Sequence, residues 1–156
     1  MNFIALLVAA IIPMIVGFVY YHKSVVGSAW MSVTGMTEEK AQQGNMPLIF
    51  GISFLFSLFL SFGLNGIVIH QAGLFSLFGG DTADELFKQV MAVKGDAFKT
   101  FQHGALHGFI AAVVIALPIL GTNALFEQKG WKYIWINVGY WAVTLTLMGG
   151  LLCAWK

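Results

Sequence analysis

The chain has 156 residues, of which 58% are hydrophobic and only 10% are charged, so its polar surface is too small to cover a water-soluble globule. Its formal net charge is +1 and it contains no arginine, which argues against a nucleic-acid surface or a nucleotide phosphate site. The composition therefore indicates an integral membrane protein.

Charged residues are absent from four long stretches, which are Met1–His22, Ala41–Gly80, Thr100–Phe126 and Tyr133–Trp155. Each stretch contains an apolar core of about 20 residues, the length that a helix needs to cross the hydrocarbon of a bilayer. We therefore predict a single all-α domain over residues 1–156, an integral membrane four-helix bundle. Its spans are predicted at about residues 3–21, 48–71, 104–123 and 132–155.

The first predicted span contains Pro13, which should kink it. The loop that follows, residues 22–46, begins with an amphipathic segment that we expect to lie along the membrane interface. Within this loop, Thr37 precedes Glu38 and Glu39, the pattern of a helix cap followed by acidic residues in the first turn.

The second predicted span follows Pro47, a residue that suits the first position of a helix. One polar stripe repeats every four residues along this span and consists of Ser53, Ser57, Ser61 and Asn65. Such a stripe is typical of a helix–helix seam, in which small hydroxyl side chains allow close approach. The alternative is that it forms one wall of a water-lined pathway.

The second loop is the longest and holds more charged residues than any other loop. Its segment Thr82–Glu85 fits a capping box, and apolar side chains then recur at helical spacing among lysines. We predict an amphipathic interfacial segment over about residues 82–101, broken near Gly95.

The third predicted span should be kinked at Pro118, and a tight connection over residues 127–130 leads into the fourth. Gly104 and Gly108 form a GxxxG motif, which allows two helices to approach closely. The glycines at positions 63, 66, 139, 149 and 150 suit close helix contact in the same way.

Three histidines are the best candidates for chemistry. His103 and His107 are four residues apart and share one helix face, while His70 ends the second span on the same side of the membrane. Three imidazoles at one place can bind zinc or another transition metal. The alternative is that each histidine only contacts headgroups or a backbone carbonyl, so we expect no cofactor by default and a transition metal as the alternative.

A second polar set lies toward the opposite side of the membrane and consists of Tyr20, Tyr21, Trp30, Asn123, Glu127, Asn137 and Tyr140. Glu127 could pair with Lys129 or Lys132, or accept a hydrogen bond from a tyrosine or from Asn137. We favour a structural clasp that holds the last two spans together, because polar groups inside a membrane need partners. The alternative is a substrate or ion vestibule in which Glu127 is the charged element.

Four spans place both termini on one side of the membrane, together with the second loop. The lysines divide evenly between the two sides, but the close pair Lys129 and Lys132 beside the short third loop favours that side as cytoplasmic. The termini are then predicted on the opposite side.

Several segments resemble a bacterial membrane family known as domain of unknown function 1761 (DUF1761). They are Gly17–Tyr21, Gly27–Met31, Thr122–Glu127, Asn137–Tyr140, Met148–Gly150 and Trp155, and His103–Gly108 resembles longer-looped members. The resemblance covers nearly the whole chain. It implies a four-span protein of the bacterial inner membrane, no established activity and no catalytic residue that can be carried over. In such a membrane the lysine distribution predicts periplasmic termini. It also implies that the second polar set belongs to a framework shared by the family.

The sequence therefore favours a small homo-oligomeric membrane protein that acts as a channel, a carrier or an accessory subunit rather than as an enzyme. Two alternatives remain: an integral membrane metal-binding or redox enzyme that uses the clustered histidines, and a structural subunit of a larger membrane complex. The expected partners are the lipid bilayer, further copies of the chain and other membrane proteins, and not nucleic acid.

Overall fold

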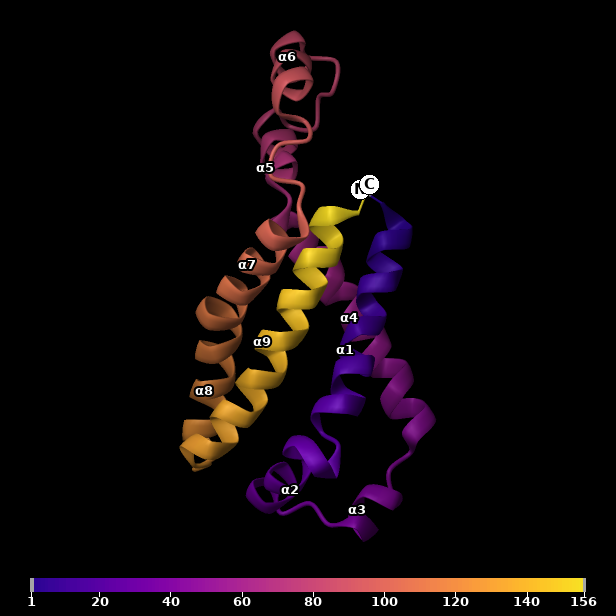
Figure 1. Cartoon of the computed structure of the whole chain (residues 1–156), viewed down its shortest axis with the longest axis vertical. Coiled ribbons are helices and arrows are strands. Elements are labelled where there is room, and N and C mark those ends of the chain that lie inside the picture. The colour runs from indigo at the N-terminus through magenta and orange to yellow at the C-terminus, as the bar shows by residue number, and fades with distance from the viewer. Residues whose placement is uncertain (1, 156) are drawn as a thin grey trace.

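The computed structural model describes residues 2–155, and within them the regular elements are all helices. Four helical runs are long and apolar enough to cross a membrane, which confirms the predicted all-α architecture with four spans. They are α1 (Phe3–Tyr20), α4 (Met46–Val68), the continuous run Phe101–Phe126 and α9 (Trp131–Ala154). Figure 1 shows both chain ends at the same end of the bundle.

The last span, α9, is the most buried of the four and lies at the centre of the packing. The core around it contains Leu6 and Ala9 from α1, Val68 from α4, and Met148 and Leu152 from α9 itself. The outer faces expose large apolar side chains such as those of Phe50, Phe56, Phe59 and Phe62 on α4. In a bilayer these faces contact lipid tails that are as apolar as the side chains, so their exposure is compatible with a stable fold.

The third span consists of α7 (Phe101–Ala111), a π-helical segment η2 (Ala112–Ala116) and α8 (Leu117–Phe126). The π-helical segment ends two residues before Pro118, the residue predicted to kink this span. Proline cannot donate a backbone hydrogen bond and its ring crowds the carbonyl four residues earlier, so a wider turn relieves the clash.

The third span begins at Phe101, earlier than the predicted residue 104, because the Thr100 side chain caps α7. The Thr100 hydroxyl accepts a hydrogen bond from the His103 amide, 3.2 Å away.

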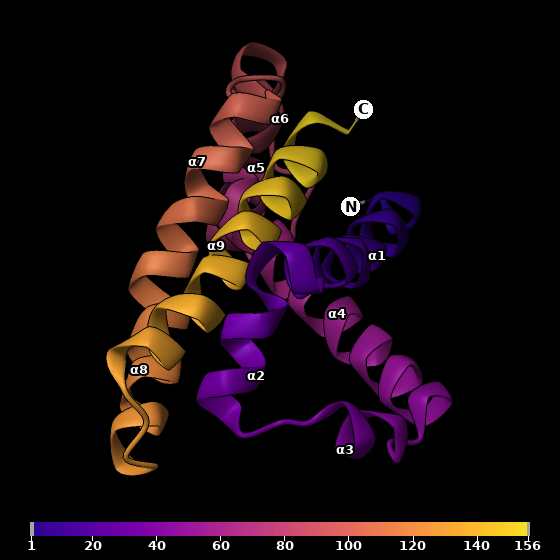
Figure 2. The ribbon, with the colours of Figure 1, turned by 60° about the horizontal axis from the view of Figure 1, so that its bottom comes forward.

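Glycines bring α7 against α9, as the GxxxG motif predicted. A Cβ atom at Gly104 or Gly149 would collide with the facing glycine's carbonyl, and one at Gly108 would collide with the Leu145 carbonyl. The expectation is wrong for Gly63 and Gly66, where an added Cβ would meet no atom within 4 Å. Both residues belong to α4, and Figure 2 shows that α4 diverges from α9 whereas the third span runs alongside α9. Glycines on α4 therefore have less close contact with α9 than those on α7.

The second span ends earlier than predicted. Its helix α4 stops at Val68, Ile69 adopts an extended conformation (φ −106°, ψ 103°), and the new helix α5 (His70–Leu77) begins at once. Gly66, a poor helix former, lies within the last turn before this break. As a result, His70 is the first residue of a separate helix instead of the end of the span.

The first loop contains a π-helical turn η1 (Lys23–Gly27), α2 (Ser28–Thr34) and α3 (Glu38–Gln42). Thr37 caps α3 as predicted, since its hydroxyl accepts the Lys40 amide. The Lys23 ammonium lies 2.6 Å from Glu38 Oε1 and joins the start of this loop to α3. That ammonium also holds the pKa of the Glu38 carboxyl below its usual value.

The second loop contains α5 and α6 (Glu85–Lys94), which stand beyond the end of the spans in Figure 1. The predicted capping box is wrong, because Asp84 rather than Thr82 caps α6 by accepting the amides of Leu86 and Phe87. The helix is also shorter than the predicted segment 82–101. An interfacial position for these helices stays a prediction.

Candidate metal centre

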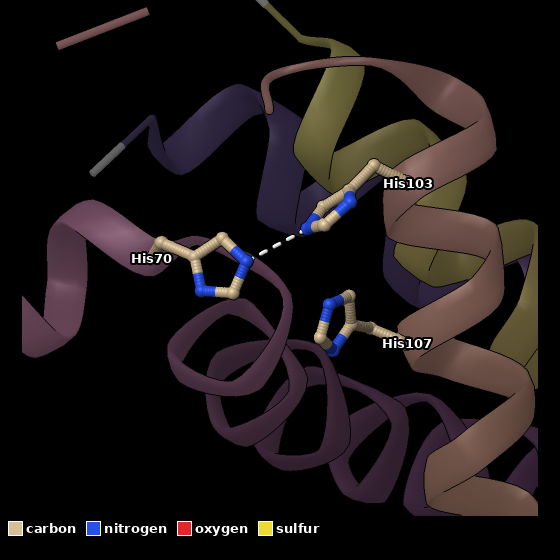
Figure 3. Close-up of side chains that lie close together, drawn as sticks. All are labelled: His70, His103 and His107. Atoms are coloured by element: carbon tan, nitrogen blue, oxygen red, sulfur yellow. Dashed lines mark hydrogen bonds between the residues drawn. The ribbon is translucent and has the colours of Figure 1, made fainter. Parts of the chain in front are cut away.

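Three histidines converge where the second loop meets the spans. The break at Ile69 places His70 at the start of α5, while His103 and His107 lie on successive turns at the start of α7. Figure 3 shows the rings of His103 and His107 directed toward His70 across the gap between the two chain segments. The fold therefore brings together side chains that are 33 residues apart in the sequence.

The imidazole nitrogens are close enough to share one metal ion. One nitrogen from each ring can be chosen so that all three lie within 4.8 Å of one another. His70 Nε2 and His103 Nε2 are 2.7 Å apart, a hydrogen bond in which one ring donates and the other accepts. In a tetrahedral zinc site, bonds of about 2.0–2.1 Å separate the donor nitrogens by ~3.3 Å, so small side-chain rotations suffice to form it.

The charge and exposure of the cluster restrict which ions suit it. His70 is exposed and the other two histidines are half-buried, so the cluster is accessible from outside. Among residues 2–155, no carboxylate or thiolate belongs to the cluster, and nearby Asp96 pairs with Lys99 at 3.4 Å. Three neutral nitrogen donors suit zinc, copper, nickel or iron, whereas calcium and magnesium require oxygen ligands.

Phe98 packs against two of these histidines in an unusual backbone conformation. Its ring stacks on His103 with centroids 5.0 Å apart and meets His70 edge-on at 5.5 Å. Its φ of 64° is left-handed, which costs a residue with a Cβ roughly 1–2 kcal/mol. Sequence reasoning missed Phe98, because phenylalanine rarely adopts a left-handed conformation and position 98 falls within the predicted interfacial segment 82–101.

Neighbouring contacts hold this loop in place. The Gln71 side-chain amide donates to the carbonyls of Lys94 and Ala97, each 3.0 Å away, which ties the end of α6 to α5. The Cys153 sulfur lies 3.3 Å from the Phe98 carbonyl oxygen and 3.5 Å from that of Val68. The end of α9 therefore contacts both chain segments that carry the histidines.

The polar stripe of the second span lies partly inside the bundle. The Ser61 hydroxyl is fully buried and donates to the Leu6 carbonyl of α1 at 3.0 Å. Ser57 is buried and bonds the Ser53 carbonyl of its own helix, while Ser53 is exposed and Asn65 is half-buried. Two of the four side chains therefore have partners within the chain, and of these two bonds the one from Ser61 joins two helices.

Five of the seven residues in the second polar set come together between α1 and α9. Tyr20 and Tyr140 donate to the carbonyls of Ile136 and Pro13, at 3.0 and 2.9 Å, and Tyr21 donates to Asn137 Oδ1 at 3.2 Å. Trp30 meets the Tyr21 ring edge-on. Burial raises the pKa of Tyr21, which therefore stays neutral. Each hydroxyl bridges two helices, so this cluster joins α1 to α9.

The other two members, Asn123 and Glu127, are exposed and lie outside this cluster. Within the described part of the chain, the Glu127 carboxylate has no hydrogen bond or ion pair, so the predicted clasp through Glu127 does not form. Backbone bonds close the turn instead, with the Lys129 amide donating to the Ala124 carbonyl at 2.8 Å. Gln128 adopts a left-handed φ of 55° to allow it.

We expect Tyr140→Phe to lower the free energy of unfolding by about 0.6–1 kcal/mol, because it removes the hydrogen bond to Pro13 without changing the packed ring. Unfolding in mixed micelles, followed by circular dichroism, measures the change. Tyr133→Phe is the matched control, since among residues 2–155 the Tyr133 hydroxyl has no partner. Equal stability of the two variants would contradict a joining role for the Tyr140 hydroxyl.

The chain matches a known family model over nearly its whole length. A family model described as "Protein of unknown function (DUF1761)" matches residues 4–153. No curated protein and no solved structure matches the chain.

Proposed function

The chain belongs to the DUF1761 family, and from its histidine cluster we propose that it is a multi-pass membrane protein that binds one transition-metal ion at the membrane boundary. The observation that carries the proposal is the convergence of His70, His103 and His107 from two separate chain segments. Three imidazole ligands leave one coordination position free for a small molecule, as in catalytic zinc sites.

A purely structural role accounts less well for this geometry. A histidine that only contacts headgroups has no reason to direct its ring toward two other imidazoles. In the described residues, the cluster contains a single hydrogen bond, between His70 and His103, and the His107 ring has no hydrogen-bond partner. A metal ion would give a nitrogen of every ring a partner at once.

The other functions considered from the sequence have less support. A homo-oligomeric channel or carrier needs a polar path, but the hydroxyls of Ser57 and Ser61 are already bonded within the chain. For an accessory or structural subunit, the surface of residues 2–155 shows no feature that identifies a protein partner. We further propose that the metal centre faces the periplasm from a bacterial inner membrane. It lies at the same end of the bundle as the termini, and the pair Lys129 and Lys132 favours the opposite side as cytoplasmic.

The test is a titration of metal-free protein in detergent with cobalt(II), a spectroscopic substitute for zinc. We expect saturation at one cobalt per chain and the intense visible bands of a four-coordinate ion, which added zinc should abolish. Binding in this way contradicts the default expectation that the protein has no cofactor. Absent or unsaturable binding would contradict the proposal.

A further inference from the structure

An apolar groove runs along the side of the bundle between α4 and the third span. It has a volume of about 450 Å³, within the usual range for a site that holds a small molecule. Its floor is formed by Trp141 and Leu145 of α9, and its walls include Gly63 and Ile67 of α4 and Ile119 of α8. Since these elements are spans, the groove lies at the depth of lipid tails.

One end of the groove is lined by residues that lie close in the sequence to the histidines of the metal centre. Ile67 is three residues before His70, and Ala111 is one helical turn after His107 on the same face of α7. From there the lining residues run along α4 back to Phe59 and along the third span to Leu120, roughly 12–14 Å at 1.5 Å per residue. The combined site is therefore polar and metal-binding at one end and apolar over the rest of its length.

We infer that this combined site binds a single-tailed fatty carboxylate, with the carboxylate on the free position of the metal and the tail in the groove. The inference rests on the proposed function, because the metal is what holds the carboxylate. It identifies the ligand class of the metal centre as a lipid with one chain and one negative charge.

The charge of the cluster favours an anionic ligand. Three neutral imidazoles leave the two positive charges of a divalent ion uncompensated, and no carboxylate in the described residues joins them. A fatty carboxylate supplies both an oxygen ligand and a negative charge. A phosphate head would carry more charge and is usually held by arginine, which the chain lacks.

The size of the groove favours one acyl chain over a protein helix. A helix about 10 Å wide occupies ~900 Å³ over 12 Å of its length, about twice the volume of the groove. Gly63 leaves open space in the wall of the groove, because a Cβ atom there would meet nothing within 4 Å. Gly63→Leu should therefore fill the groove without disturbing the helix contacts.

The experiment uses cobalt-loaded full-length protein in nanodiscs and follows the visible cobalt bands while dodecanoate is added. Gly66→Leu is the matched control, because Gly66 also lies on α4 but does not line the groove. A Cβ atom at Gly66 would likewise meet no atom within 4 Å. The tail partitions into the bilayer equally in every sample, so a difference between the two variants reports the groove alone. Acetate tests the head without a tail, and dodecanol tests the tail without a charge.

We expect dodecanoate to shift the cobalt bands of the wild type and Gly66→Leu at the same concentration, and Gly63→Leu to require at least tenfold more. Acetate should act equally on all three proteins, and dodecanol should leave the bands unchanged.

If Gly63→Leu responds to dodecanoate like the wild type, the groove does not hold the tail and the inference is overturned, although the metal centre stands. If dodecyl phosphate displaces dodecanoate at lower concentration, the carboxylate head is the wrong choice. If cobalt does not bind to the wild type, the metal centre and this inference both fail.

Discussion

His107→Ala is expected to weaken cobalt(II) binding at least about 100-fold while the helical content and the free energy of unfolding stay close to those of the wild type. Mutating a residue that only orients a metal ligand commonly lowers the metal affinity 10–100-fold, so removing a direct ligand should lower it further. His107 is half-buried at the start of α7, and its ring has no hydrogen-bond partner in the described residues, so its removal should disturb little else. Competition with a chelator of known affinity measures the change.

The fourth histidine of the chain supplies the control. His22 lies in the first loop, where its ring accepts a hydrogen bond from the Ser24 amide, and it is not part of the cluster. His22→Ala should therefore bind cobalt like the wild type, and free imidazole should restore part of the lost affinity to His107→Ala by occupying the vacated place. Equal losses in the two variants would show that cobalt binds elsewhere.

Gly108→Leu is expected to destabilise the protein by at least about 3 kcal/mol, the upper end of the usual cost of overpacking a core. The reason is that even the Cβ atom would collide with the Leu145 carbonyl, a backbone group that cannot move aside as a flexible side chain can. A leucine must therefore push α7 away from α9, and because α7 carries two of the three histidines, cobalt affinity should fall with stability. Unfolding in mixed micelles and the cobalt titration measure both effects.

Gly51→Leu is the control for this substitution. Gly51 lies on α4, and a Cβ atom at that position would meet nothing within 4 Å. The variant should be as stable as the wild type, since leucine is a better helix former than glycine and faces open space. A Gly108→Leu protein as stable as Gly51→Leu would contradict the close α7–α9 packing.

Part of the metal centre could be predicted from the sequence. Helical periodicity alone places His103 and His107 on one face, and the second loop, which joins the end of the second span to the start of the third, places His70 at the same end of the bundle. The actual meeting of the rings depends on the chain break at Ile69 and on the left-handed Phe98, and neither residue type signals such a conformation. The prediction for Glu127 lacked such support, because a carboxylate in a tight turn at a helix end can remain exposed without a partner.

The sequence by itself determined that the chain forms four helices long and apolar enough to cross a membrane, because uncharged stretches of this length can satisfy their backbone groups in lipid by forming helices. It also indicated that glycines in the spans could allow two helices to pack closely. Only the tertiary structure decided which glycines are used and which, like Gly63, border a groove instead. The physical reason is that an apolar helix face is equally stable against lipid tails and against another helix, so hydrophobicity does not predict which face packs inside the bundle. That choice depends on close backbone packing and on polar contacts between distant segments.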